Sequence, residues 1–218
     1  MTKEEQDILL KEGKMLPVME HFYTIQGEGA HTGKAAYFIR LGGCDVGCHW
    51  CDVKESWNPD LHPLMDVEEV AETAASYCKT IVLTGGEPLM WNLDVLTSKL
   101  KELGCQIHIE TSGAYPVSGQ LDWITLSPKK TGLPLDEVYS KAQELKVIIF
   151  NNHDFQFAEE QAAKVSENCK LYLQSEWSKR DAMYPKITDF ILANPKWQAS
   201  VQTLSLIHIS EPTRRRGI

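Results

Sequence analysis

Three cysteines stand close together in the chain, spaced Cys44-x-x-x-Cys48-x-x-Cys51. Three thiolates at this spacing can hold an iron–sulfur cluster. A 4Fe-4S cluster has four irons, so three cysteine ligands leave one iron open to bind and activate a small molecule. The open iron favours catalysis over electron storage.

Two other uses of clustered cysteines are open at this point. A structural zinc site usually has four protein ligands and could recruit His49 or Asp52. A disulfide framework is less favoured, because Cys78, Cys105 and Cys169 are scattered and because the chain has no secretory signal or apolar membrane span. We expect a reduced, cytoplasmic protein.

The composition is that of one globular domain with small-molecule partners. With 218 residues, of which 43% are hydrophobic and 24% charged, the chain can bury one substantial core. The formal net charge of −8 argues against nonspecific binding to nucleic acid or to an anionic membrane. A local basic pocket for an anionic substrate is compatible with that charge.

The last residues differ from the rest of the chain. Residues 204–218 read like the translation of a transposase sequencing adapter, followed by the basic remnant Arg215-Arg216-Gly217-Ile218. We interpret this tail as non-native and expect the native sequence to stop near Thr203. The alternative is a basic tail that binds a partner, although three arginines usually mark only a solvated end.

The elements that must position these residues alternate between short β-rich runs and helical patterns. Such alternation is typical of an α/β fold with a mainly parallel sheet covered by helices. The predicted strands are Pro17–Thr24, Ala35–Leu41, Thr80–Thr84, Cys105–Glu110, Trp123–Leu126, Leu145–Phe150 and Lys170–Leu173, with Gln198–Thr203 as an eighth candidate. The predicted helices run from a capping Asp66 to about Cys78 and over Asn92–Leu103, Pro134–Glu144, Asp154–Glu167 and Arg180–Ala193, the last kinked or restarted at Pro185.

Polar and glycine-rich clusters follow the predicted strands. In a β/α barrel the loops after the strands share one rim, where the active site is built. Each cluster alone could be an ordinary turn. Together they predict a single mouth formed by Gln26-Gly27-Glu28-Gly29, the cysteine loop, Gly85-Gly86-Glu87-Pro88, Thr111-Ser112-Gly113, Ser127-Pro128-Lys129 and Gln174-Ser175-Glu176.

The cysteine loop and the later Gly85-Gly86-Glu87-Pro88 run resemble the radical S-adenosylmethionine (SAM) superfamily. Within it, the chain is similar to the 7-carboxy-7-deazaguanine synthase family. The similarity extends from about Pro17 to Thr203 and implies a partial, open (β/α) barrel, with one radical SAM domain over residues 1–203. The runs that carry it are Phe22-Tyr23-Thr24-Ile25-Gln26-Gly27-Glu28-Gly29, Phe38-Ile39-Arg40-Leu41, Thr84-Gly85-Gly86-Glu87-Pro88-Leu89, Glu110-Thr111-Ser112-Gly113 and Ser127-Pro128-Lys129.

This resemblance implies a lyase activity. The family converts 6-carboxy-5,6,7,8-tetrahydropterin to 7-carboxy-7-deazaguanine and ammonia, a ring contraction on the route to queuosine, a modified tRNA nucleoside. The implied cofactors are a 4Fe-4S cluster, SAM and Mg²⁺, and the implied partners are the pterin and an electron donor such as flavodoxin or ferredoxin. A homodimer is also implied.

The resemblance assigns residues to the cofactors. The three cysteines of the loop would ligate the cluster. Gly85 and Gly86 let the backbone approach the methionine part of SAM, while Glu87 can accept a hydrogen bond from its ammonium. The other predicted SAM contacts are Trp50, Cys51, Asp52, Ser127, Pro128, Lys129 and Gln174.

The predicted substrate contacts surround the pterin. Gln26 and Glu28 suit the donor and acceptor edge of a 2-amino-4-oxo ring, and Arg40 can pair with the substrate carboxylate. An ordinary strand-end salt bridge is the alternative for Arg40. The full predicted set is Ile25, Gln26, Gly27, Glu28, Arg40, Thr84 and Thr111.

Two positions depart from the family pattern. Relatives usually carry Thr or Ser at the position of Val53, where the hydroxyl helps to hold Mg²⁺, and valine has no oxygen to donate. Mg²⁺ could still bind through substrate, water or backbone oxygens. Relatives also continue after Val201-Gln202-Thr203 with a His-Lys pair that contributes to the substrate pocket. We therefore expect weaker pterin binding or slower turnover in this chain.

Two other functions are alternatives to this interpretation. Another radical SAM enzyme, such as a glycyl-radical activase, shares the cluster loop and the glycine run but has no need of Gln26, Glu28 and Arg40 arranged for a pterin. A noncatalytic zinc-binding module would be indifferent to SAM. Product analysis and iron-dependent colour separate these functions.

Overall fold

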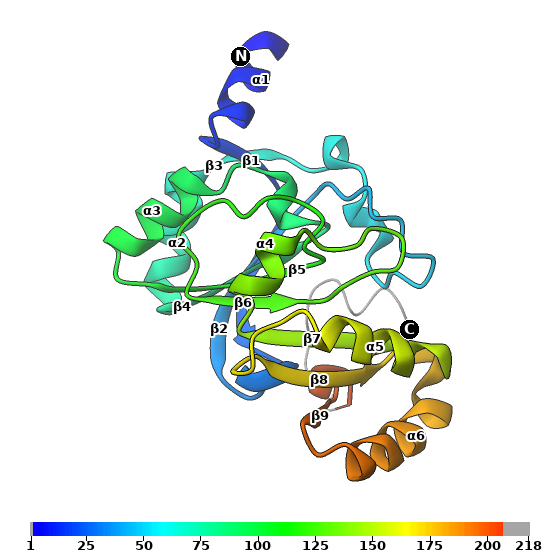
Figure 1. Cartoon of the computed structure of the whole chain (residues 1–218). Coiled ribbons are helices and arrows are strands. Elements are labelled where there is room, and N and C mark those ends of the chain that lie inside the picture. The colour runs from blue at the N-terminus through cyan, green and yellow to red at the C-terminus, as the bar shows by residue number, and fades with distance from the viewer. Residues whose placement is uncertain (1, 207–218) are drawn as a thin grey trace.

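The computed structural model of the protein describes residues 2–206 and contains one curved sheet (Figure 1). Its strand order is β3-β1-β2-β4-β5-β6-β7-β8-β9. Neighbours from β2 to β9 are parallel, whereas β1 pairs antiparallel with β2 and β3. The strands are β1 (Met15–Ile25), β2 (Ala35–Leu41), β3 (Leu64–Asp66), β4 (Thr80–Gly85), β5 (Gln106–Thr111), β6 (Trp123–Leu126), β7 (Glu144–Ile149), β8 (Lys170–Ser175) and β9 (Trp197–Ser200).

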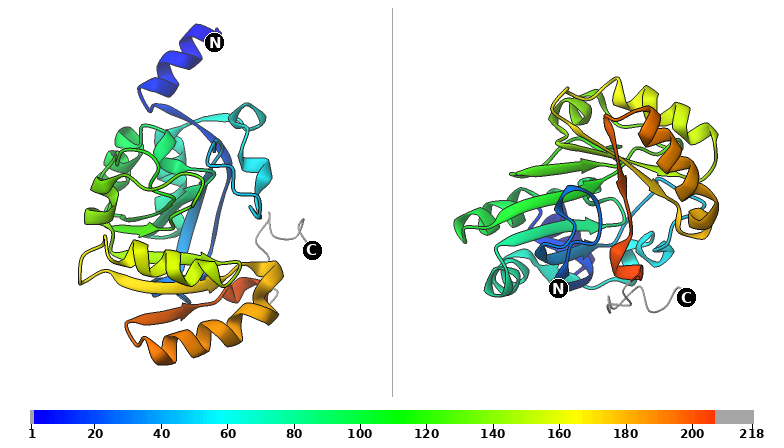
Figure 2. Two further views of the ribbon diagram at one scale, coloured as in Figure 1. Left: turned by 45° about the vertical axis from the view of Figure 1, so that its right-hand side comes forward. Right: turned by 90° about the horizontal axis from the view of Figure 1, so that it is seen from below.

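Most helices cover the outer face of the sheet, because parallel neighbours need long crossover connections (Figures 1 and 2). Helix α1 instead projects from the body of the protein. The α-helices are α1 (Lys3–Lys11), α2 (Val67–Tyr77), α3 (Asp94–Glu102), α4 (Asp136–Lys141), α5 (His153–Ala162), α6 (Arg180–Ala193) and α7 (Thr203–Leu206). The short 3-10 turns are η1 (Gly29–His31), η2 (Lys54–Ser56), η3 (Pro59–Leu61), η4 (Pro88–Met90) and η5 (Trp177–Lys179). None of the helices within residues 2–206 has the length and apolar character needed to cross a membrane.

Strands β5 and β7 alternate between an apolar outer face and an inner face that carries charged side chains. On β5, Ile107 and Ile109 are fully buried in the main hydrophobic core, while Glu110 faces the interior of the curved sheet. On β7, Val147 belongs to the core and Lys146 faces the interior. Parallel strands buried on both faces are usually apolar throughout. Here the inner face carries charged side chains beside apolar ones such as Phe38 and Ile148, which also line the cavity.

All predicted strands are present. The ranges predicted for β2 and β6 are exact, and the other strands differ by one to a few residues at their ends. Asp66 caps α2 as predicted, because its Oδ1 accepts hydrogen bonds from the backbone N–H groups of Glu68 (2.8 Å) and Glu69 (3.2 Å). The helix predicted over Pro134–Glu144 was too long, since α4 is a short helix and Glu144 begins β7. Helix α6 passes through Pro185 without ending. The helix predicted over Asp154–Glu167 was also too long, since α5 ends at Ala162, and helices α1 and α7 and strand β3 were not predicted.

The prediction of a single rim was wrong for the loop after β1. Because β1 runs antiparallel to its neighbours, Gln26-Gly27-Glu28-Gly29 lies at the amino-terminal end of the parallel strands. The curvature of the sheet brings the residues after β9 to this loop, where the backbone N–H of Thr203 donates to the carbonyl of Gly27 (3.1 Å). The result is a partial barrel whose gap is bridged by this contact.

Candidate active site

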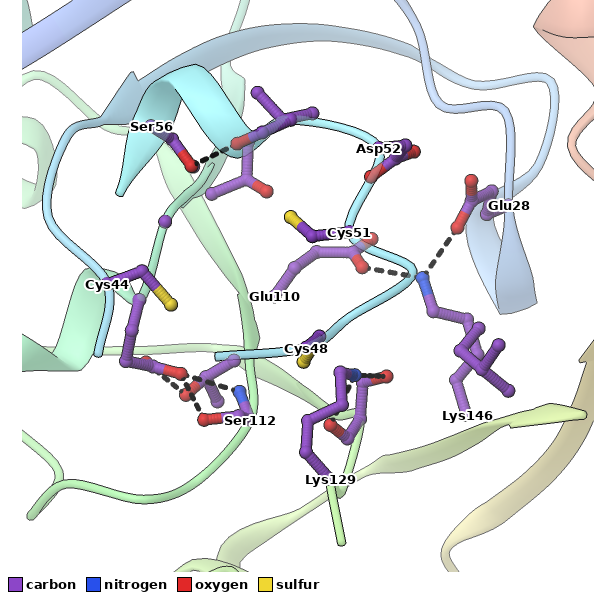
Figure 3. Close-up of a pocket in the computed structure, with 18 of the residues that line it drawn as sticks. Glu28, Cys44, Cys48, Cys51, Asp52, Ser56, Glu110, Ser112, Lys129 and Lys146 are labelled. Carbon is purple, nitrogen blue, oxygen red and sulfur yellow. Dashed lines mark hydrogen bonds and ion pairs between the residues drawn. The ribbon is translucent and has the colours of Figure 1, made fainter. Parts of the chain in front are cut away.

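A cavity of about 720 Å³ occupies the interior of the partial barrel (Figure 3). This volume is in the range of pockets for cofactors and substrates. Of the predicted site residues, all line the cavity except Ile25 and Pro128. The cavity therefore unites residues from the loops after β1, β2, β4, β5, β6 and β8.

The cysteine loop forms one wall of the cavity. Backbone hydrogen bonds pin its start to the segment that follows it, from Gly43 to Ser56 (2.6 Å) and from Cys44 to Trp57 (3.1 Å). The three cysteines of the loop are half-buried free thiols, and Figure 3 shows them around the same space. Burial raises the pKa of Cys44 and of Cys48. These thiols fit a ligand that binds thiolates and replaces the lost hydration.

The same loop does not fit a structural zinc site. Within the described part of the chain, no three His, Cys, Asp or Glu side chains converge closely enough to hold one metal ion. His49 instead packs edge-on against Phe150, with ring centroids 5.3 Å apart. Three thiols spread over one loop suit a cluster, which is larger than an ion.

The end of β4 packs directly on the cysteine loop. The N–H of Gly86 donates to the carbonyl of Leu41 and the N–H of Glu87 to that of Gly43, both at 2.8 Å. A Cβ at Gly86 would lie 2.2 Å from the carbonyl oxygen of Gly43 and 3.0 Å from the Cβ of Cys44. Only glycine allows this close approach.

Glu87 connects the ends of two neighbouring strands. Its side chain is buried, and its carboxylate accepts hydrogen bonds from the N–H of Leu89 (3.0 Å), Thr111 Oγ1 (2.5 Å), and the N–H (2.7 Å) and Oγ (2.5 Å) of Ser112. These four bonds use the lone pairs that a carboxylate offers. Glu87 thus clamps β4 to β5, and its contact with the SAM ammonium stays a prediction.

Lys129 brings a positive charge to the cysteine loop. Its Nζ donates to the carbonyl (2.7 Å) and Oγ (2.6 Å) of Ser127 and lies 5.5 Å from the ring centroid of Trp50. Desolvation lowers the pKa of Lys129, against the opposing attraction of Cys48. On β8, Gln174 is buried and accepts a hydrogen bond from Ser200 Oγ of β9 (2.6 Å).

A charged network also lines the cavity. Lys146 Nζ lies 2.7 Å from Glu28 Oε2 and 2.6 Å from Glu110 Oε2. Gln26 Nε2 donates to Glu110 Oε1 (3.0 Å), and Gln202 Nε2 donates to Glu28 Oε1 (3.1 Å). The loop after β1 is thereby fastened to β5 and β7, which explains how it reaches the cavity from the opposite end of the sheet.

Arg40 lies in the cavity wall next to Thr84, its partner in the register of β2 and β4. Its Nε is 2.9 Å from Glu20 Oε1, and the Arg40 side chain is 11% exposed. The strand-end salt bridge considered as an alternative is therefore present. A contact between the cavity-facing Arg40 and the substrate carboxylate stays a prediction.

Val53 does not fit a protein-held Mg²⁺. Its side chain lines the cavity and has no oxygen. Its carbonyl already accepts hydrogen bonds from Ser56 Oγ (2.7 Å) and the Ser56 N–H (3.1 Å). Val53 therefore has no side-chain oxygen for a hard cation, and its carbonyl oxygen is already used by Ser56.

Sequence reasoning missed part of the cavity. The unpredicted charged lining residues are Glu110 and Lys146, each the polar member of an alternating strand, and that alternation was an available signal. Leu204, assigned to the tail, is also buried against Gly27. Ser112, Ser175 and Glu176 also line the cavity and belong to the clusters predicted to form its mouth, and the remaining unpredicted lining residues are Phe38, Val46, Ser56, Trp57, Ile148, Trp177 and Gln202.

Comparison with known proteins agrees with this geometry. The model of the "Radical SAM superfamily" matches residues 38–164. The chain is 63% identical over 209 residues to 7-carboxy-7-deazaguanine synthase of Flavobacterium psychrophilum, covering 96% of this chain and 99% of that protein. It is 50% identical over 188 residues to the enzyme of the same name from Synechocystis sp., covering 86% of this chain and 90% of that protein.

A solved structure shares the fold. The crystal structure of QueE from Escherichia coli superimposes with a TM-score of 0.77 at 31% identity, covering 91% of this chain and 98% of that chain. The matched superfamily region includes the cysteine loop and the glycine run, which the structure holds together through backbone hydrogen bonds. The chain therefore belongs to the radical SAM superfamily and, within it, to the 7-carboxy-7-deazaguanine synthase family.

Proposed function

We propose that this chain converts 6-carboxy-5,6,7,8-tetrahydropterin to 7-carboxy-7-deazaguanine with release of ammonia. The observation that carries the proposal is 63% identity, over nearly the whole length of both chains, to a relative named for making this product. The cavity supports it, because thiols for a cluster and polar groups suited to a pterin line one space. The reaction makes the chain a lyase of queuosine biosynthesis.

Different residues of the cavity bind the cofactors and the pterin. Cys44, Cys48 and Cys51 hold the cluster, and the end of β4 presents backbone to the methionine part of SAM. When bound, the cluster and SAM would supply radical chemistry for the removal of a hydrogen atom from the pterin ring. The buried interior keeps water from competing with that hydrogen transfer.

A second group of cavity residues binds the pterin. Gln26, Glu28 and Gly27 meet the 2-amino-4-oxo ring, with Thr84 and Thr111 beside it, and Arg40 draws the substrate carboxylate toward β2. We derive no step through Mg²⁺, because Val53 offers no free oxygen.

The partners follow from the same chemistry. A radical SAM reaction needs one electron from outside, which we assign to a flavodoxin or ferredoxin. We also propose that the enzyme works as a homodimer in the cytoplasm, without a nucleic-acid or membrane partner.

An anaerobic assay tests the proposal. Protein with a reconstituted cluster receives reductant, SAM and 6-carboxytetrahydropterin, and mass spectrometry follows 5'-deoxyadenosine and 7-carboxy-7-deazaguanine. Both products are expected, and both disappear in Cys48→Ala. Cys78→Ala removes a thiol outside the cavity and serves as the matched control. Deoxyadenosine without the deazaguanine, at saturating pterin, would refute the assigned substrate and favour another radical SAM reaction.

A further inference from the structure

Lys146 is a buried cation held between two carboxylates from distant parts of the chain (Figure 3). Its side chain is 5% exposed, against 13% for Glu28 and 21% for Glu110. All three residues line the cavity that the cysteine loop also lines. The two carboxylates are close neighbours because they share one ammonium.

The charge of Lys146 is fixed. Burial alone lowers the pKa of a lysine, but attraction to Glu110, Glu28 and Glu144 outweighs burial and raises the pKa of Lys146. The ammonium therefore does not act as an acid at neutral pH. Other titratable groups facing this network are Lys129 after β6, whose positive charge repels that of Lys146, and Tyr184 of α6, whose pKa is raised by burial and by the charge of Glu28.

The network keeps two anionic acceptors at the cavity. One ammonium between two carboxylates carries a net charge of about −1. The two oxygens of Glu110 accept from Gln26 and Lys146, which leaves two of the roughly four lone-pair sites of this carboxylate for a ligand. Without the ammonium, two such carboxylates would share a proton, and the protonated one would donate where it now accepts.

We propose that Lys146 is a positioning residue that holds the carboxylates of Glu28 and Glu110 side by side, so that both accept hydrogen bonds from the N–H donors of the pterin's 2-amino edge. This inference rests on the proposed function, since it names the part of the pterin that is recognised. On this proposal Glu110 determines substrate specificity together with Glu28. The site should therefore discriminate against a ring that lacks the 2-amino group. Charge-assisted hydrogen bonds of this kind are strong in a buried pocket.

The test measures equilibrium binding of two nonreacting ligands to the SAM-loaded holoenzyme. 6-Carboxypterin keeps the 2-amino group, whereas 6-carboxylumazine has oxygen in its place, and the fluorescence of each ligand reports binding. Binding is measured between about pH 5.5 and pH 7.5, where carboxylates that share a proton titrate. The variants are Lys146→Met, Lys146→Arg and the charge-balanced double variant Lys146→Met with Glu28→Gln. Lys141→Met removes a lysine from an exposed ion pair and serves as the control.

We expect the wild type to prefer the pterin with little dependence on pH. Lys146→Met should weaken pterin binding about tenfold to a hundredfold near pH 5.5, recover part of it as the pH rises, and lose preference for the 2-amino group. The double variant leaves a single carboxylate that needs no counter-charge, so its binding should again be independent of pH. Lys146→Arg should retain most of the preference.

The outcomes separate this inference from the proposed reaction. If Lys146→Met binds both ligands more weakly by one factor at every pH, Lys146 is merely structural and the inference is overturned. The same holds if Lys146→Met matches the wild type while the wild type makes 7-carboxy-7-deazaguanine. If the pH signature and the 2-amino preference appear but no deazaguanine is made, the inference stands and the reaction fails. A wild type that binds neither ligand overturns both.

Discussion

The contact between the end of β4 and the cysteine loop makes Gly86→Ala a severe test of the site. The added Cβ would lie 2.2 Å from the Gly43 carbonyl oxygen and 2.7 Å from its carbon. Nonbonded atoms of this size prefer about 3.5 Å, so the loop and the strand must separate by roughly 1 Å. That movement stretches the two 2.8 Å backbone hydrogen bonds that join them.

The cost can be worked from these contacts. Each strained buried hydrogen bond costs about 1 kcal/mol, and overpacking adds about 1–3 kcal/mol. The free energy of unfolding should fall by about 3–5 kcal/mol, which lowers the melting temperature of a domain this size by roughly 10 °C. The three thiols move with the loop, so the holoprotein should also hold less iron.

Two measurements check this prediction. Circular dichroism follows thermal unfolding of the apoprotein, and iron is counted after anaerobic reconstitution. Gly132→Ala is the matched control, because Gly132 also has no positive φ and its Cβ would meet Val46 at an ordinary 3.6 Å. Gly86→Ala with the melting temperature and iron content of Gly132→Ala would show that the close packing of β4 on the loop does not hold the site together.

Two further predictions concern Val53 and Glu144. Wild-type turnover after chelation should not respond to Mg²⁺, whereas Val53→Thr, which restores a hydroxyl, should gain a response and bind Mg²⁺ in calorimetry with substrate present. Stimulation of the wild type by Mg²⁺ would contradict the mismatch at Val53. Burial raises the pKa of Glu144 to about 7 from an ordinary 4.5. The folded protein thus holds this proton where the unfolded chain releases it, so the stabilisation is complete below about pH 4.5 and is lost as the pH rises toward 7. Glu144→Gln should therefore gain stability relative to the wild type between about pH 5 and pH 8, by at most about 3 kcal/mol, in denaturant unfolding. Glu137→Gln, at an exposed carboxylate, should show no such gain, and a constant difference for Glu144→Gln across this range would contradict the assigned pKa.

Local sequence patterns predicted most of the helices and strands. The strands were found because each is a short apolar run bounded by turn residues, and α2 because Asp66 stands where a cap is needed. The length of α4 was misjudged because Glu144 looks like a helical residue, while its pairing with Lys170 across the sheet makes it part of β7. Tertiary pairing overrode a local preference there.

For the site, the sequence alone predicted the cluster chemistry, whereas the tertiary structure decided which distant residues lie together in the cavity. The spacing of Cys44, Cys48 and Cys51 predicts a cluster because those residues lie on one short loop, where sequence distance limits spatial distance. Lys146 and Glu28 are 118 positions apart, and their ion pair exists only because β1 runs antiparallel and the sheet curves. The direction of a strand and the curvature of a sheet arise from the packing of the whole core, so no local pattern contains them.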